Sequence, residues 1–599
     1  MKPQRQYCAA ALQFEPEHAA KDRNLDRLSH LIREGAANGA KVIVTPEMAT
    51  VGIFWENREH IAPYVETIPG YTTDYFAKLA GELDIYVVIG MAEVNPATNA
   101  YYNSAALIGP DGLVGVHRKV HAYVSDPLWA VDGDLGFQTW ETPLGKLGVM
   151  ICMDANYPES SRLLALHNAD VLLVPVTWLV EVCPAPLWIT RAFENGLHAV
   201  CANRWGSEMG HQISGGSCVL NPDGSIQNCA ANESGDVIVY GEIDLDDPRR
   251  QRLADDSGLQ PLGSRRPELY GSLLLNRYLW DSREMQAQFT AHPLPDGSAF
   301  NMVVMEWDQP LPVEQRLAQL DALLDGLDGA LPQLIVLPEL SFSGAPDSAA
   351  QAVAYAQTVE GEIVQALAGW CAGRRCYLVA GIVEQGSDGL YNTQVLIGPE
   401  GLCATYRKTH LSGTDLLWAT AGDRLVWADT PLGRIGLLSG TDLLFPEPVR
   451  CLAIQSVDVV CVSAALGQPD PIYQRAFLPD KADGVHWHLA RTRAGENDVY
   501  IAFANWRNIG HMGHSGIFFG PSLFAAPQVE ALVGQGDYAA LTIDMHTDPH
   551  SALRTKPGIQ RRFPSHYGLM TAPKEAPTSD GQAGRRLITN ENDRVQEAV

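Results

Sequence analysis

The sequence predicts an α/β protein in which one layered domain, roughly 280 residues long, occurs twice in tandem. Two observations carry this prediction. First, residues 117–134 (HRKVHAYVSDPLWAVDGD) align without a gap with residues 406–423 (YRKTHLSGTDLLWATAGD), and nine of these 18 positions are identical. Second, short apolar runs rich in Val and Ile alternate along each copy with stretches of helical periodicity. Helices that cover the faces of a mixed sheet form a layered α/β domain.

Further matching segments occur in the same order in both copies, which chance does not produce. The matched pairs are 42–48 with 334–340, 142–150 with 430–438, 191–195 with 493–497, and 264–273 with 560–570.

The elements of the first copy follow from the spacing of its apolar residues. Residues 24–40 place Leu25, Leu28, Leu31 and Ile32 at helical intervals, and a glycine near the end of this segment marks the helix terminus. Continuous apolar runs are typical of strands that are buried on both faces. Such runs occur at 41–47, 86–93, 148–152 and 170–176.

The repeat and the local composition divide the chain into three parts. The first copy is expected at 1–285 and the second at 299–575, joined by a segment around 275–298 that contains the turn-forming sequence PLPDGS. The remaining residues, 576–599, are polar and are expected to form a disordered tail.

Composition argues against several kinds of partner. Among 599 residues, 70 Asp and Glu outnumber 43 Lys and Arg, so the net charge of −27 opposes binding to nucleic acid and to anionic membrane surfaces. No run of 18 apolar residues is present, and the apolar stretch at the N-terminus is too short for a secretory signal. Eleven Cys without metal-type spacing indicate a reduced, cytoplasmic protein with no metal and no cofactor.

Three residues of the first copy follow expected strands and could carry chemistry: Glu47, Lys119 and Cys152. Open α/β sheets form their sites at the carboxyl ends of strands. Cys152 precedes a helical pattern, and a nucleophile on such a strand-to-helix turn is expected to be exposed beside backbone N–H groups. Each residue alone has an ordinary explanation, as a loop carboxylate, a surface charge or a small buried hydrophobe. Only the three residues taken together predict a catalytic site.

That combination resembles the nitrilase superfamily of carbon–nitrogen hydrolases. The resemblance rests on PEM at Glu47, HRKVH at Lys119, GVMICMD at Cys152 and ENGLHAVCANR at 194–204, and it extends to both copies. It implies a four-layer αββα sandwich for each copy and a Glu–Lys–Cys triad. Glu47 would serve as general base and then general acid, while Lys119 would stabilise the oxyanion and lower the pKa of the Cys152 thiol.

The resemblance also points to Met153 and to Asp126. The backbone N–H of Met153 would join Lys119 at the oxyanion. Several tryptophans follow segments near the expected site, and most are expected to belong to the core. Of these, Trp178 is expected to line a pocket for the acyl group. Many family members carry a second Glu about seven positions after the lysine. Asp126 stands there in this chain, and its shorter side chain leaves its catalytic role open.

The second copy is not equivalent to the first. Glu339, Lys408 and Asp415 stand at the expected positions, but Gly440 aligns with the nucleophile. Ser439 is one residue away, and a shift of one residue along a strand is expected to point its side chain to the opposite face. The second copy is therefore expected to be catalytically silent and to pack on the first as an intramolecular pseudo-dimer. Further homo-oligomerisation stays open.

The predicted function is that of a thiol amidohydrolase, which cleaves a C–N bond of a small amide or N-carbamoyl compound through a Cys acyl-enzyme and releases ammonia or an amine. Two alternatives remain: a nitrilase that converts a nitrile to acid and ammonia, and a non-enzymatic binding or scaffold protein. The triplet Cys152-Met153-Asp154 favours amides, because nitrilases of this superfamily usually have Cys-Trp-Glu. The complete triad argues against the scaffold.

Overall fold

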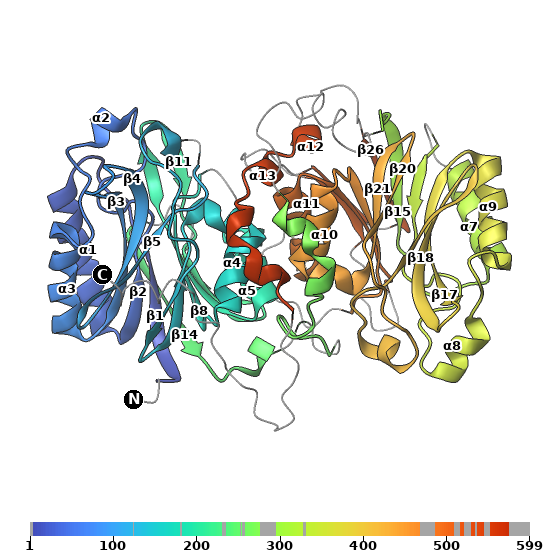
Figure 1. Cartoon of the computed structure of the whole chain (residues 1–599), viewed down its shortest axis with the longest axis horizontal. Coiled ribbons are helices and arrows are strands. Elements are labelled where there is room, and N and C mark those ends of the chain that lie inside the picture. Colours follow the sequence, from blue (N-terminus) through green and yellow to red (C-terminus); the bar gives the residue numbers. More distant parts are fainter. Residues whose placement is uncertain are drawn as a thin grey trace, which may run out of the picture.

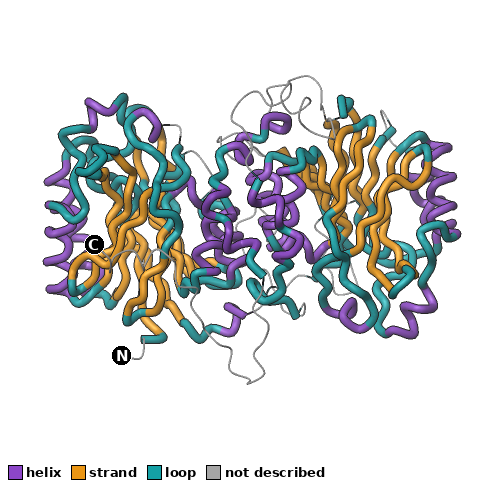
Figure 2. The backbone as a smooth tube through the Cα atoms, viewed as in Figure 1, coloured by secondary structure: helices purple, strands orange, loops and turns teal. Residues whose placement is uncertain are grey.

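A computed structural model describes residues 4–123, 125–179, 183–230, 235–251, 253, 258–275, 295–326, 331–467, 485–507, 515–519, 529–533, 536–543 and 552–573. It consists of two similar halves that lie side by side along the long axis of the molecule (Figure 1). In each half two β-sheets are stacked between helices, so that helices form both ends of the molecule and also its centre (Figure 2).

The first half contains two six-stranded sheets. The sheet on the outer side, away from the other half, has the order β14-β1-β2-β3-β4-β5, and the inner sheet has the order β13-β12-β9-β8-β7-β6. Strands β1, β2 and β3 are parallel, as are β7, β8 and β9. The outer strands are β1 (Gln6–Gln13), β2 (Ala40–Val44), β3 (Tyr86–Val94), β4 (Tyr101–Gly109), β5 (Gly112–Arg118) and β14 (Val237–Asp244). The inner strands are β6 (Thr139–Thr142), β7 (Gly145–Val149), β8 (Val171–Val176), β9 (His198–Asn203), β12 (Cys218–Leu220) and β13 (Ile226–Cys229), and a separate hairpin is formed by β10 (Trp205–Glu208) and β11 (His211–Ser214).

Helices cover both faces of this pair of sheets. Helices α1 (Lys21–Ala37) and α3 (Tyr71–Leu83) pack on the outer sheet through an apolar cluster that includes Leu28 and Phe76. Helices α4 (Pro158–Leu166) and α5 (Pro186–Asn195) cover the inner sheet on the side of the other half, and a short α2 (Arg58–Ile61) precedes α3. The expected helix at 24–40 is thus found as α1.

The second half repeats this architecture with sheets ordered β19-β18-β17-β16-β15-β26 and β20-β21-β22-β23-β24-β25. Its outer strands are β15 (Phe300–Met305), β16 (Leu334–Val336), β17 (Tyr377–Gln385), β18 (Leu390–Gly398), β19 (Gly401–Arg407) and β26 (Tyr538–Ile543). Its inner strands are β20 (Val426–Thr430), β21 (Gly433–Ser439), β22 (Val459–Ser463), β23 (Tyr500–Ala504), β24 (Gly516–Phe519) and β25 (Val529–Leu532). Its helices are α7 (Val313–Asp325), α8 (Ala349–Tyr355), α9 (Glu362–Arg374), α10 (Pro446–Ile454), α11 (Val485–Asn497), α12 (Ala552–Thr555) and α13 (Pro557–Gln560).

The two halves share one packed junction. Helices α4 and α5 face α10 and α11 across it (Figure 1), and a single apolar cluster contains Leu163 of α4 together with Leu452 of α10 and Leu489 of α11. The halves therefore do not have separate cores in the region where they meet.

Each half also sends its C-terminal segment onto the other half. In the first half, Arg265 lies 2.7 Å from Glu447, and Tyr270 bonds His410 at 3.0 Å. In the second half, Arg562 lies 2.7 Å from Glu159 of the first half. This reciprocal exchange closes the junction from both sides.

The predicted fold class, two tandem four-layer αββα sandwich domains, is confirmed. The boundaries 1–285 and 299–575 stay predictions, while the expected tail, 576–599, and most of the joint between the copies lie outside the described residues. None of the helices in the described part of the chain has the length and apolarity needed to cross a lipid bilayer.

Candidate active site

The polar residues singled out from the sequence meet at one edge of the paired sheets of the first half. Glu47 follows β2 in the outer sheet, and Cys152 follows β7 in the inner sheet, so both lie beyond the carboxyl ends of parallel strands. Lys119 follows β5 directly. The loops at this edge bury all three side chains, which are at most 4% exposed.

A buried ammonium group joins two carboxylates at the centre of the site. The Nζ atom of Lys119 lies 2.7 Å from Oε1 of Glu47 and 2.7 Å from Oδ2 of Asp126. Burial alone would lower the pKa of Lys119, but the negative charges of Asp126 and Glu47 raise it well above its ordinary value, so the side chain stays protonated. Asp126 reaches the lysine despite its short side chain.

Asn103 of β4 completes this network and was not identified from the sequence. Its Nδ2 donates to Oε1 of Glu47 at 2.8 Å and to Oδ1 of Asp126 at 3.2 Å, which fixes the two carboxylates relative to each other. The sequence does hold a sign that Asn103 matters, because the dipeptide Tyr102-Asn103 recurs as Tyr391-Asn392 in the second copy.

Cys152 begins the short helix η2 (Cys152–Asn156) with a left-handed backbone, φ 45°. Such a conformation is uncommon for a residue with a side chain and is frequent at functional turns. The Sγ atom donates a hydrogen bond to the carbonyl oxygen of Thr177 at 3.6 Å. The expectation that the turn exposes this residue is wrong: Cys152 is 4% exposed, because it is packed within the core between the strand ends.

The thiol is neutral at rest. Burial raises the pKa of Cys152 well above its ordinary value, the charge of Glu47 raises it further, and the positive charge of Lys119 lowers it only in part. Lys119 therefore lowers the pKa of the thiol, as expected, but its effect is smaller than the combined effect of burial and the charge of Glu47. A thiolate at this position needs a base that removes its proton, and the nearby Glu47 carboxylate can provide one.

Met153 and Trp178 both lie next to Cys152. Met153 is the second residue of η2, within the first turn, where backbone N–H groups lack acceptors inside the helix. Trp178 follows Thr177, its backbone N–H donates to Oδ1 of Asn203 at 2.8 Å, and its ring meets that of Trp188 edge to face at 5.6 Å. Both positions suit the predicted contacts with substrate, which stay predictions.

Asp154 holds η2 in place through hydrogen bonds to the backbone and to two histidines. It accepts from the backbone N–H groups of Ile151 and His121, both at 3.0 Å, and it lies 2.8 Å from Nε2 of His117. Burial alone would raise the pKa of Asp154, but hydrogen bonds from His117 and His121 outweigh it and lower the pKa. These two histidines are thus occupied by a carboxylate. Among the described residues, no group of three or more His, Cys, Asp and Glu side chains could hold a metal ion.

The second half keeps the same polar centre. Lys408 lies 2.8 Å from Glu339 and 2.6 Å from Asp415, and Asn392 donates to Glu339 at 2.7 Å. Gly440 begins the helix η7 (Gly440–Leu444), and its backbone lies outside the left-handed region that Cys152 adopts.

Two details show that this second centre differs around Gly440. A Cβ atom on Gly440 would lie 3.1 Å from both Cα and Cβ of Ala464 and 3.3 Å from Leu466, so the space of the missing side chain is filled. The expected orientation of Ser439 is wrong, because its Oγ donates to Oε1 of Glu339 at 2.9 Å. Strand β21 ends at Ser439, where the chain turns into η7 and the alternation of side chains no longer applies.

Comparison with known proteins gives one family and several relatives. The sequence model of the carbon-nitrogen hydrolase family matches residues 8–252 and 312–554. A nitrilase from Pyrococcus abyssi is 35% identical over 262 residues, which cover 44% of this chain and 98% of that protein. Omega-amidase NIT2 from Danio rerio is 32% identical, over 42% of this chain and 91% of that protein. Citrullinase from Francisella tularensis is 30% identical, over 42% of this chain and 92% of that protein. Each of these relatives has about the length of one half.

Proposed function

Because the chain belongs to the carbon-nitrogen hydrolase family, we propose that its first half is a thiol amidohydrolase acting on a small amide or an N-carbamoyl compound. The observation that carries this proposal is a buried thiol on a left-handed turn next to an ion pair between a carboxylate and a lysine. The residues are Cys152, Glu47 and Lys119.

The first step would form an acyl-enzyme. Glu47 takes the proton of the Cys152 thiol, and Sγ attacks the carbonyl carbon of the substrate. The negative charge that develops on the carbonyl oxygen is stabilised by Lys119 and by the backbone N–H of Met153. Glu47 then gives its proton to the leaving nitrogen, the C–N bond breaks, and ammonia or an amine departs.

The second step would release the acid. Glu47 takes a proton from a water molecule, the resulting hydroxide attacks the thioester carbon, and the C–S bond breaks as Cys152 regains a proton. Asp126 pairs with Lys119, and Asn103 donates to both Glu47 and Asp126. Their proposed role is to hold the base and the lysine in place.

The substrate class is supported by the residues around the thiol and by the relatives. Asp154, two residues after Cys152, stands at the position where nitrilases of the superfamily usually have Glu. In addition, similar chains include an omega-amidase and a citrullinase. A nitrile remains the second candidate, because another similar chain is a nitrilase with 35% identity.

Ammonia release by the purified full chain from a panel of aliphatic amides, N-carbamoyl amino acids and nitriles tests the proposal. We expect turnover of amides or carbamoyl compounds, its loss in Cys152→Ala, and a thioester on the Cys152 peptide by mass spectrometry with a slow substrate. Nitrile turnover exceeding amide turnover would favour the second candidate, and full amide turnover by Cys152→Ala would refute the thiol mechanism.

A further inference from the structure

We propose that Glu496, in the half that lacks a nucleophile, acts through Arg191 as a positioning residue for the turn that carries Cys152. The inference rests on the proposed function, since it assumes that the geometry of this turn limits catalysis. It assigns to the second half a specific contact with the active half, in addition to general packing.

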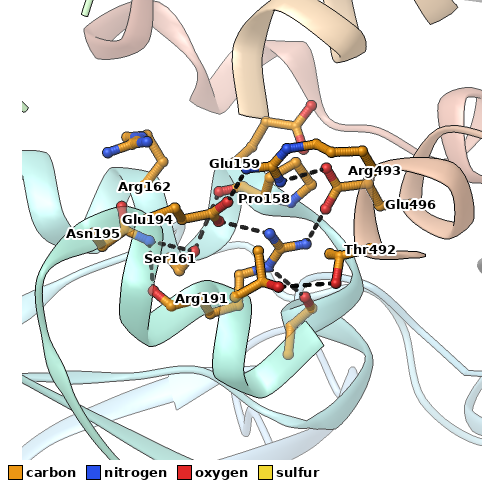
Figure 3. Close-up of polar contacts among 12 residues, drawn as sticks. Pro158, Glu159, Ser161, Arg162, Arg191, Glu194, Asn195, Thr492, Arg493 and Glu496 are labelled. Carbon is orange, nitrogen blue, oxygen red and sulfur yellow. Dashed lines mark hydrogen bonds and ion pairs between the residues drawn. The ribbon is translucent and has the colours of Figure 1, made fainter. Parts of the chain in front are cut away.

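Four charged residues meet at the centre of the junction, and we call them the junction quartet: Arg191 and Glu194 of α5, with Arg493 and Glu496 of α11 (Figure 3). Arg191 pairs with Glu194 at 2.6 Å and with Glu496 across the junction. Arg493 pairs with Glu496 at 2.9 Å and with Glu194 across the junction at 2.6 Å. All four side chains are buried.

The quartet contacts the nucleophile turn directly. Nε of Arg191 donates to the carbonyl oxygen of Ala155 at 2.8 Å, and Ala155 lies in the same short helix η2 that Cys152 begins. Nη1 of Arg191 donates to Glu194, and Nη2 donates to Glu496. A guanidinium group is planar and rigid, so fixing its two Nη atoms also fixes the direction in which Nε points.

This arrangement makes Glu496 one of the two supports of Arg191. Without that carboxylate, Nη2 would be buried without its acceptor, and the guanidinium would turn toward another one. The carbonyl of Ala155 and the short turn before it would then move relative to Lys119 and Glu47. Catalysis is sensitive to such a shift, since a misplacement of about 1 Å can cost about 10²-fold in rate.

The second half provides a matched control. Arg493 has the same two glutamate partners. Its Nε, however, donates at 3.2 Å to the carbonyl of Leu443, which lies in η7, three residues after Gly440. Arg191→Lys and Arg493→Lys therefore disturb the same quartet and leave a positive charge in it. Only the first removes a contact to the turn of Cys152.

The test compares Arg191→Lys, Arg493→Lys and Glu496→Met in the full chain, using kcat, KM, Tm and the pH profile of Cys152 alkylation by iodoacetamide, read on the Cys152 peptide. We expect equal losses of Tm in the two lysine variants. Arg191→Lys and Glu496→Met should lower kcat at least tenfold with KM within twofold, and should shift the alkylation profile. Arg493→Lys should keep kcat within threefold and leave the profile unchanged.

Equal losses of kcat in the two lysine variants would overturn the inference, because the quartet would then only hold the halves together. A wild-type kcat in Glu496→Met would also overturn it. If a variant fails to fold, Glu496→Asp, which shortens the side chain by one methylene, is judged by the same criteria. Alkylation reports the position of Cys152 whatever the substrate is, so failure of the proposed function is recognised separately, by turnover in Cys152→Ala.

Discussion

Replacing Lys119 with methionine separates the chemical role of the ammonium group from its structural role. The change keeps the length and much of the volume of the side chain but leaves the buried carboxylates of Glu47 and Asp126 without the cation that now lies 2.7 Å from each. Lys408→Met is the matched control, because Lys408 lies between Glu339 and Asp415 at 2.8 and 2.6 Å in the half where Gly440 stands at the nucleophile position.

The structural cost should be the same in both variants. Removing one partner of a buried ion pair costs about 3–5 kcal/mol of unfolding free energy. With an unfolding entropy of about 2.1 cal/mol/K per residue, a chain of 599 residues that unfolds as one unit should lose roughly 2–4 °C of Tm. Differential scanning calorimetry of each variant measures this loss.

The catalytic cost should appear in Lys119→Met alone. Loss of one group that stabilises an oxyanion costs about 3–4 kcal/mol in the transition state, which lowers kcat by about 10²–10³-fold. Lys408→Met should keep turnover within about twofold of the wild-type chain, on the assumption that the second half is silent. Equal losses of turnover in both variants, or a raised KM with unchanged kcat in Lys119→Met, would refute the proposed role of Lys119.

Three further outcomes are expected. Glu47→Gln should lower kcat by about 10²–10⁴-fold. It should also move the midpoint of the pH profile of Cys152 alkylation by iodoacetamide to lower pH, because the charge of Glu47 raises the pKa of that thiol; an unchanged or higher midpoint would contradict this electrostatic effect. Gly440→Cys introduced into Cys152→Ala should not restore turnover, because Ala464 fills the space of the new side chain, and restored ammonia release would refute this. The fragment 1–290 should be insoluble or inactive without its partner half, so size-exclusion chromatography that finds a monomeric, fully active fragment would show that the second half has another task.

The fold and the centre of the site could be predicted because the signals are local or repeated. Continuous apolar runs indicate buried strands, and a polar residue directly after such a run lies at a sheet edge. Glu47 and Cys152 each follow such a run, in β2 and β7. The repeat supports each of these predictions a second time, since each predicted element of the first copy has a counterpart in the second.

Three features could not be predicted from local patterns. The burial of Cys152 depends on how the strand ends and loops of two sheets pack around it. Ser439 points toward Glu339 because the strand ends at that residue, so an alternation rule fails there. The contact between Arg191 and Glu496 joins residues 305 positions apart, and the matching segments RAFEN and RAGEN indicated a repeat without indicating that its two copies touch.

The reciprocal exchange of C-terminal segments also sets the order of events during synthesis. Glu159 lies in the first helix of the junction, and the Arg562 that pairs with it is 403 residues later in the chain. At about 5–20 residues per second, a ribosome needs roughly 20–80 s to reach that arginine. Until α10 and α11 have also been made, the first half stands next to the ribosome with the face of α4 and α5 that packs on them uncovered. Its final packing is therefore completed only near the end of translation, and shielding by a chaperone would be most useful during that wait.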